Sequence, residues 1–361
     1  MANKKNKKNE NEDKEKGFSK MSIVWYPGHM AKTKQKMIND LKLVDIVIEV
    51  LDARIPISSQ NSDLEKIMQS KKRIIVLNKA DLADDNVTAN WIKRFKENGV
   101  TAIPVEANNR KYAKKIIDVI KNESIEIANE YAKKGRNSKR IRAMVFGIPN
   151  VGKSTFINLL AGKNIVKSEN RPGVTKANQW IKISDNIDLM DTPGMLWPKI
   201  DNEKAKLNLA FTNSIPENVI DNEEIAFYLL KFLVENYRSN LEKRYGIIIE
   251  ENNDNNENFN SDLVNEKIKS SQGNNNNTNN FNGALINKEA KSNQGNNDED
   301  ENKNENKNGL FDSSAIIDVR EKIALKTGAR LSGGNIDEMK VSNIILNDFR
   351  SGKLGKISLE E

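Results

Sequence analysis

The stretch GIPNVGKST occupies residues 147–155, after an apolar run at 142–146 and before a helical pattern at 155–160. Glycines and a lysine at this spacing predict a phosphate-binding loop, because backbone N–H groups in such a turn can surround a β-phosphate. The positive N-terminal end of the following helix would add to that attraction. Since a strand, the loop and a helix are all expected in the required order, we favour this interpretation over a chance glycine-rich turn.

The side chains of this loop have separate expected roles. Gly152 permits the tight turn, Lys153 would reach the β- and γ-phosphates, and Ser154 would ligate Mg²⁺. The residues predicted to bind nucleotide in this loop are Asn150, Val151, Gly152, Lys153, Ser154 and Thr155.

A second motif, NKAD at 78–81, follows an apolar run at 74–77. Guanine presents an N1–H and an exocyclic amine side by side, so the Asp81 carboxylate would accept both, whereas adenine would leave that charge unpaired. Asn78 would brace the loop and the edge of the base, and the stem of Lys79 would pack over the ring. Taken alone, the same four residues also fit a polar turn between a strand and a helix.

A third motif, DTPG at 191–194, follows an apolar run at 187–190. Asp191 lies where a second Mg²⁺-coordinating carboxylate is needed, and the Gly194 N–H would contact the γ-phosphate. Thr175, in the stretch RPGVT, is predicted to ligate Mg²⁺ and to sense the same phosphate, because it lies between the phosphate-binding loop and DTPG.

The order of the motifs along the chain is unusual. Base recognition at NKAD, and then at VEAN (105–108), precedes the phosphate-binding loop, which precedes DTPG. At VEAN a backbone N–H near Ala107 is predicted to bind the guanine carbonyl, although structural filler explains that stretch equally well. In the usual GTPase order the phosphate-binding loop comes first. We therefore expect a circular permutation, with the old chain ends joined through residues 135–141.

Apolar runs alternate with helical patterns as far as residue 205. This alternation predicts a mostly parallel sheet with helices on both faces and a hairpin at its edge. The expected fold class is therefore α/β, a circularly permuted P-loop GTPase domain, joined to a small all-α C-terminal domain. The expected strands are 46–51, 74–77, 101–105, 142–146, 180–183 and 187–190, and the expected helices are 31–43, 60–70, 87–98, 111–134, 155–160, 217–245, 313–325 and 335–349.

Composition divides the 361 residues into ordered and low-complexity parts. Residues 1–20 are mostly Lys, Asn and Glu with little to bury, and they predict a disordered basic tail. We expect the GTPase domain over residues 21–205. The helical C-terminal domain is expected over 206–361, interrupted by a disordered Asn-rich insertion at 249–309.

Charge and residue usage limit the classes of function. The formal net charge of +7 favours a polyanionic partner, with nucleic acid first, although a lysine-rich proteome would explain it equally well. The absence of Cys excludes disulfides and thiolate catalysis, and a single His excludes a His-rich metal cluster. No apolar run is long enough to span a membrane, and no secretory signal is evident. We therefore expect a cytoplasmic protein without a membrane partner.

Seven motifs carry a resemblance to a known family: WYPGHMAK at 25–32, DARIP at 52–56, NKADL at 78–82, GIPNVGKST at 147–155, PGVT at 172–175, DTPGML at 191–196 and DFRSGKLGKISLE at 348–360. In this order they resemble the circularly permuted bacterial ribosome biogenesis GTPase A family. The resemblance implies binding of GTP and GDP, and binding of the immature large ribosomal subunit and its rRNA. It also implies hydrolysis of GTP during late assembly, stimulated by that particle, and a C-terminal domain similar to RNA-binding modules. A monomer is expected.

The position after DTPG bears on catalysis. Small GTPases usually place there a Gln that orients the attacking water, whereas this chain has Met195, so slow intrinsic hydrolysis is expected. Elimination and the resemblance point to His29, in a Pro-Gly turn before a basic helix, as the catalytic residue. A structural His is the alternative. Similarity to GTPases that lack the Gln also implies a K⁺ ion at Asn150, where simple loop capping is the alternative.

Two other functions stay open beside a ribosome-assembly GTPase. One is an RNA-binding assembly scaffold that uses GTP as a structural switch with little turnover, which Met195 favours and His29 opposes. The other is a tRNA-modifying GTPase, which the permuted order and the absent Cys disfavour.

Overall fold

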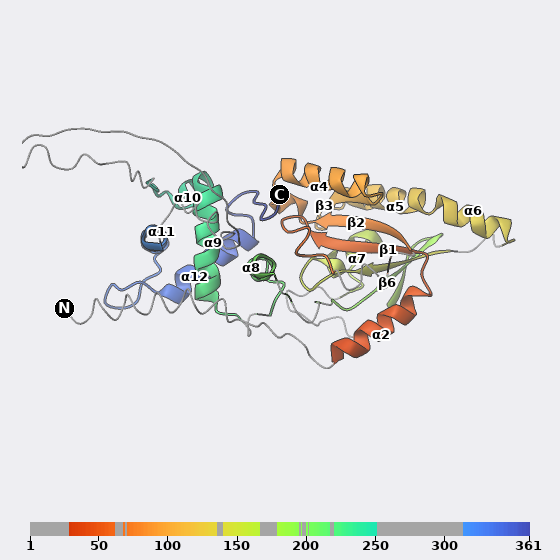
Figure 1. Cartoon of the computed structure of the whole chain (residues 1–361), viewed down its shortest axis with the longest axis horizontal. Coiled ribbons are helices and arrows are strands. Elements are labelled where there is room, and N and C mark those ends of the chain that lie inside the picture. The colour runs from red at the N-terminus through yellow and green to blue at the C-terminus, as the bar shows by residue number, and fades with distance from the viewer. Residues whose placement is uncertain are drawn as a thin grey trace, which may run out of the picture.

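The computed structural model describes residues 29–61, 68, 71–135, 140–166, 179–194, 196, 200, 202–216, 220–250 and 313–361, with the backbone alone at 29–34. Figure 1 shows two neighbouring regions in these ranges: a twisted sheet with its helices, and a bundle of helices built from the later part of the chain. The tail at 1–20, residues 62–67, 69 and 70 of the helix expected at 60–70, and residues 251–309 of the expected insertion lie outside the described residues.

The described ranges form one six-stranded sheet with the order β3-β2-β1-β4-β6-β5. All neighbouring strands are parallel except β5, which pairs antiparallel with β6 at the sheet edge, as the sequence predicts. The circular permutation is visible along the chain, because the phosphate-binding loop follows the fourth strand, β4, whereas in the usual GTPase order it follows the first. The strands are β1 (Ile46–Asp52), β2 (Lys72–Asn78), β3 (Thr101–Val105), β4 (Ile141–Phe146), β5 (Gln179–Ser184) and β6 (Ile187–Asp191).

Central strand β1 is buried along its whole length, which explains its nearly continuous apolar sequence. Alternate residues of β1 point to opposite faces of the sheet. Ile48 and its same-face neighbours pack against α5 (Tyr112–Glu123) and α7 (Lys153–Ala161). On the opposite face, Val47 lies in a cluster with α2 (His29–Leu41), and Leu51 lies in one with α4 (Asp85–Glu97). The sheet is therefore covered by helices on both faces, as predicted.

Several helices begin at a side chain that caps their first turn. Asp84 accepts hydrogen bonds from the backbone N–H groups of Asn86 and Val87 at the start of α4. The helix expected at 111–134 is instead two helices, α5 and α6 (Ile125–Lys133), which meet at Ser124. The prediction ran through this break because the apolar stripe continues across it.

The later part of the chain is helical. Central helix α9 packs against the other four, and the core of the sheet region continues into this bundle without a gap. The helix expected at 217–245 is wrong in extent, because Tyr237 leaves the helical conformation and separates α9 from α10. The bundle helices are α8 (Glu203–Phe211), α9 (Asn222–Asn236), α10 (Arg238–Tyr245), α11 (Ser313–Thr327) and α12 (Glu338–Arg350).

Helix α8 is not predicted by the sequence, and the domain boundary expected at residue 205 falls inside it. The helix begins after Asn202, whose side chain accepts a hydrogen bond from the Ala205 N–H at 3.1 Å. The last residues of the chain return to the sheet region, and Figure 1 shows the C-terminus beside α4. None of the helices in the described ranges combines the length and apolar character that a membrane crossing requires.

Candidate guanine-nucleotide site

The predicted motifs gather at one edge of the sheet. NKAD begins at the last residue of β2, VEAN at the end of β3, the phosphate-binding loop directly after β4, and DTPG at the last residue of β6. Because these strands are parallel, their carboxyl ends meet at the same edge, which is where ligands bind in open α/β sheets. Motifs far apart in sequence therefore line one site.

The phosphate-binding loop has the backbone that the sequence predicts. Asn150 and Gly152 both lie in the left-handed region, with φ of 60° and 94°. Helix α7 begins at Lys153, so its first N–H groups open onto the loop. A Cβ atom on Gly152 would overlap the Nδ2 atom of Asn78, so only glycine fits there without displacing the base-recognition motif.

Asn78 connects three of the motifs. Its Nδ2 donates to the Val151 carbonyl at 2.7 Å, and its Oδ1 accepts from the Ala107 N–H at 3.2 Å. The side chain is 2% exposed, so these bonds are protected from water. The Ala107 N–H, near which the sequence predicts a contact to guanine, thus helps to hold the Asn78 side chain in place. A direct contact between Ala107 and the base stays a prediction.

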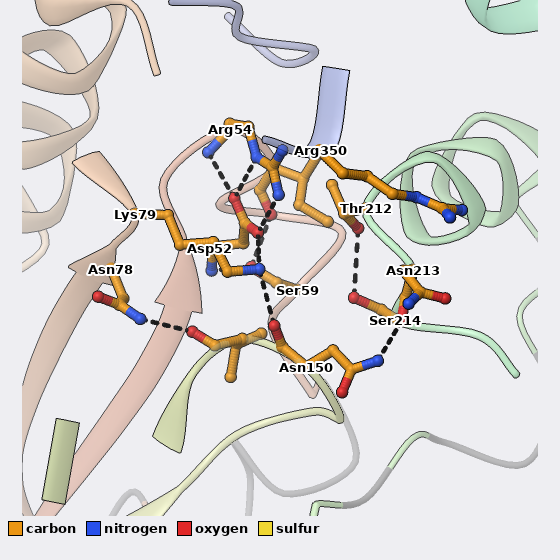
Figure 2. A network of polar contacts seen from close by, with 12 residues as sticks. Asp52, Arg54, Ser59, Asn78, Lys79, Asn150, Thr212, Asn213, Ser214 and Arg350 are labelled. Carbon is orange, nitrogen blue, oxygen red and sulfur yellow. Dashed lines mark hydrogen bonds and ion pairs between the residues drawn. The ribbon is translucent and has the colours of Figure 1, made fainter. Parts of the chain in front are cut away.

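Lys79 joins base recognition to phosphate binding (Figure 2). Its backbone is left-handed, with φ of 58°, and its Nζ donates to the Asn150 carbonyl at 2.7 Å and to Asp52 at 2.9 Å. Burial lowers the pKa of Lys79 below its ordinary value, although the Asp52 charge opposes that shift. These two contacts hold the Lys79 side chain between β1 and the phosphate-binding loop. The packing of its stem over the base stays a prediction.

Asp52 is the buried counter-charge of this network. Burial would raise the pKa of its carboxyl, but the charges of Arg54 and Lys79 outweigh burial and hold the pKa well below its ordinary range. Arg54 binds it through Nε at 2.9 Å and Nη2 at 2.8 Å, a two-pronged pair. The sequence assigns no role to Asp52 or Arg54, and only the DARIP motif in the family resemblance marks their position.

Lys153 and Gly194 bring the phosphate loop and DTPG together. A Cβ on Gly194 would lie 2.9 Å from Lys153 Nζ and 3.0 Å from the Pro149 backbone nitrogen, so the two segments are in close contact. Lys153 is 7% exposed and donates to the Ile148 carbonyl at 2.7 Å. Burial lowers its pKa to about 8, against the opposing effect of the Asp191 charge nearby. A phosphate group at this position would favour the charged form again.

The oxygen atoms of Ser154 and Asp191 are suitable ligands for Mg²⁺. Ser154 lies in the first turn of α7, and Asp191, 1% exposed, ends β6 beside Val145 of β4. The described residues contain no cluster of three or more His, Cys, Asp or Glu side chains that could hold a metal ion. In nucleotide sites, however, Mg²⁺ is commonly bound by few protein oxygen ligands, such as a hydroxyl and a carboxylate, together with the phosphates of the substrate. Ser154 and Asp191 therefore fit the predicted metal.

Asp81 is exposed at the mouth of the site, in the short 3₁₀ helix η1 (Ala80–Leu82). Partial desolvation and the charge of Glu106 raise the pKa of its carboxyl, and that carboxylate remains accessible to a base. Three predicted or related positions lie outside the described residues: Thr175, Met195 and the side chain of His29, although the backbone of His29 begins helix α2. Ser154 and Thr155 directly follow Lys153 in α7. The predicted site residues that lie together are Asn78, Lys79, Ala107, Asn150, Val151, Gly152, Lys153, Asp191 and Gly194.

A nucleotide-binding loop, a guanine-type base motif and a DTPG segment on this sheet define a circularly permuted P-loop GTPase. The family model described as 50S ribosome-binding GTPase matches residues 142–259. Ribosome biogenesis GTPase A of Bacillus cereus is 36% identical over 94% of both chains. That of Priestia megaterium is 45% identical over 63% of this chain and 79% of its own. The chain therefore belongs to the ribosome biogenesis GTPase A family.

Solved structures agree on the fold. A GDP-bound structure of YlqF matches with a TM-score of 0.51 and 23% identity over 90% of this chain and 98% of its own. A GNP-bound YlqF from T. maritima matches with a TM-score of 0.50 and 22% identity over 91% and 98%. At this level of identity the likeness concerns the fold alone.

Proposed function

We propose that this protein is a GTPase that binds the immature large ribosomal subunit and hydrolyses GTP during late assembly of that subunit. The observation that carries the proposal is the convergence of the permuted NKAD, phosphate-loop and DTPG segments at one sheet edge. Membership of the ribosome biogenesis GTPase A family supports the ribosomal part of the proposal. The proposal includes rRNA as the surface contacted, a monomeric protein and a cytoplasmic location.

Nucleotide binding is assigned to the chain's own groups. Asp81 selects guanine, while Lys153 and the N–H groups of the loop hold the phosphates. Ser154, Asp191 and Thr175 would hold Mg²⁺, which when bound neutralises charge on the β- and γ-phosphates. A K⁺ ion at Asn150 is a further part of the proposal. The Asn150 Nδ2 donates to Asn213 at 2.5 Å, so its Oδ1 is the atom that would face an ion.

Hydrolysis is assigned to His29. Because Met195 cannot polarise water, we propose that His29 orients the attacking water when the ribosomal particle fixes the start of α2. Lysines on the same helix, among them the exposed Lys36, suit RNA phosphates. This arrangement predicts slow turnover in solution and fast turnover on the particle.

Two measurements test the function. Co-sedimentation with immature large subunits is compared in GDP and in a non-hydrolysable GTP analogue, and tighter binding with the analogue is expected. Single-turnover hydrolysis is then measured with and without saturating subunits. Subunit binding without any stimulation of hydrolysis would favour the alternative, an RNA-binding scaffold that uses GTP as a structural switch. Absence of binding to any ribosomal particle would refute both.

A further inference from the structure

Two motifs to which the sequence assigns no role in the nucleotide site contact each other. The DARIP loop follows β1, and the segment 348–360 ends the chain, yet the Leu359 N–H donates to the Arg54 carbonyl at 2.9 Å. The guanidinium of Arg54 also lies 4.9 Å from the ring centroid of Phe349 in α12. The helical C-terminal region therefore contacts both the backbone and the side chain of Arg54, which lies in a loop of the GTPase region.

Glu360 strengthens the same junction. Its carboxylate accepts hydrogen bonds from the backbone N–H groups of Ile57, at 2.6 Å, and Ser58, at 3.0 Å. It also accepts from Asn208 of α8 at 3.1 Å. The final segment thus fastens the residues that directly follow DARIP to helix α8. A further bond, from the Ile357 N–H to the Leu82 carbonyl at 2.9 Å, is made directly after the base-recognition motif.

From Arg54 a continuous set of contacts leads to the phosphate-binding loop (Figure 2). Arg54 binds Asp52, Asp52 binds Lys79, and Lys79 binds the carbonyl of Asn150 in the phosphate-binding loop. Asn150 then donates to the Asn213 carbonyl in the segment after α8.

The set returns to the C-terminal region at α12. Arg350, the residue after Phe349, donates to the carbonyls of Phe211 at 3.0 Å and Ala210 at 3.1 Å. The contacts therefore form a closed ring that contains groups of both regions.

Burying the Arg54 guanidinium costs free energy, which argues that this group does more than fill space in the core. The residue is 1% exposed, and its Nη1 has no hydrogen-bond partner among the described residues. A buried ion pair of this kind is often no more stable than well-packed apolar side chains would be, and here one donor is left unsatisfied as well. The guanidinium nevertheless does what an apolar side chain would not do, because it orients Asp52 toward Lys79 while resting on Phe349.

We propose that Arg54 is a positioning residue that couples docking of α12 and the final segment to the affinity of the nucleotide site. When Phe349 and Leu359 hold Arg54, Asp52 holds Lys79, and Lys79 holds the phosphate-binding loop in its binding conformation. Coupling of this kind is reciprocal, so bound nucleotide strengthens docking of the C-terminal region by the same factor. The inference rests on the proposed nucleotide site and adds a route by which the C-terminal region reports on it.

The test measures the dissociation constant of fluorescent GDP together with urea unfolding. Phe349→Leu removes the ring beneath Arg54 without touching any nucleotide-binding residue, and we expect a loss of affinity of about 5-fold or more. Phe349→Met serves the same purpose should the leucine variant fold poorly. Ile345→Val, buried in the same helix, is the matched control and should lose stability without losing affinity.

A second measurement tests the route through Arg54. Arg54→Lys keeps the charge but loses the two-pronged contact, so it should weaken GDP binding as Phe349→Leu does, and the double variant should be no weaker than either single one. In wild type, GDP should also slow hydrogen exchange at the Leu359 N–H, and this protection should be lost in Phe349→Leu. Affinity equal to wild type in the Phe349 variants, or an equal loss in Ile345→Val, would overturn the coupling. Strictly additive losses would overturn the route through Arg54.

Failure of the proposed site gives a different result. If wild type binds no GDP, or if Asp81→Asn binds it unchanged, then the nucleotide site itself is wrongly assigned. If wild type binds GDP and Asp81→Asn binds it more weakly, while Phe349→Leu binds it with the affinity of wild type, then only the coupling is wrong.

Discussion

Helix α7 offers a matched pair of glycines with which to measure how tightly the site is assembled. Gly152 lies before its first residue, with φ of 94°, and Gly162 lies after its last, with φ of 69°. Both adopt a left-handed conformation that costs other residues about 1–2 kcal/mol. They differ in their surroundings, because a Cβ on Gly162 meets nothing within 4 Å, whereas one on Gly152 overlaps the Asn78 amide.

Gly162→Ala should therefore lower the free energy of unfolding by about 1–2 kcal/mol, the backbone cost alone. Gly152→Ala should cost about 2–5 kcal/mol. The added part comes from displacing the Asn78 side chain, which breaks its bonds to Val151 and Ala107 at about 0.5–1.5 kcal/mol each.

The assay is urea unfolding followed by circular dichroism without nucleotide, with the slope checked for constancy among variants. Placing Gly152→Ala in an Asn78→Ala background should reduce its cost to that of Gly162→Ala, since the overlapping amide is then gone. An equal decrease in the free energy of unfolding for Gly152→Ala and Gly162→Ala would refute the reasoning, because the Asn78 side chain could then move aside at no cost in free energy.

Four further outcomes are expected. Asp81→Asn should shift nucleotide preference from guanine toward xanthine, measured by competition binding, and unchanged GTP affinity would remove Asp81 from the base pocket. His29→Ala should reduce subunit-stimulated single-turnover hydrolysis about 10²–10⁴-fold while leaving GTP and subunit binding nearly intact, whereas equal stimulated rates would return it to a structural role. Deletion of residues 252–308 should leave GTP affinity unchanged, and a large loss would contradict that. Asp52→Asn should lower the free energy of unfolding by about 3–5 kcal/mol at pH 7. Because its folded pKa is depressed, that contribution should be present above about pH 4 and lost in stronger acid, so wild type and variant should converge only there.

The sheet was predictable because its central strands are buried on both faces. A fully buried parallel strand has an apolar sequence such as that of β1, and the polar residues that follow such runs collect at one edge. Each nucleotide motif could therefore be assigned from its own residues and the strand before it.

Helix α8 and the DARIP contacts escaped prediction for physical reasons. Residues 208–211 of α8 are buried in succession, so the helix is covered on several sides and shows no apolar stripe. The partners of Arg54 are Asp52, two residues away, and Phe349 at the other end of the chain. No local pattern marks a pairing over such a separation, and only the recurrence of both motifs in the family resemblance hinted at it.

The strand order has a consequence for synthesis of the chain. Strand β1 pairs with β2 soon after both leave the ribosome, but its other neighbour, β4, is made only after β3, α5 and α6. One edge of this fully buried strand thus lacks its native partner while residues 53 to 140 are translated, and an unpaired edge can pair with other chains. The segment 348–360, which fastens the DARIP loop, is translated later than all six strands. A nascent copy would therefore carry NKAD and the phosphate loop before the contacts that hold Arg54 against Phe349 and Leu359.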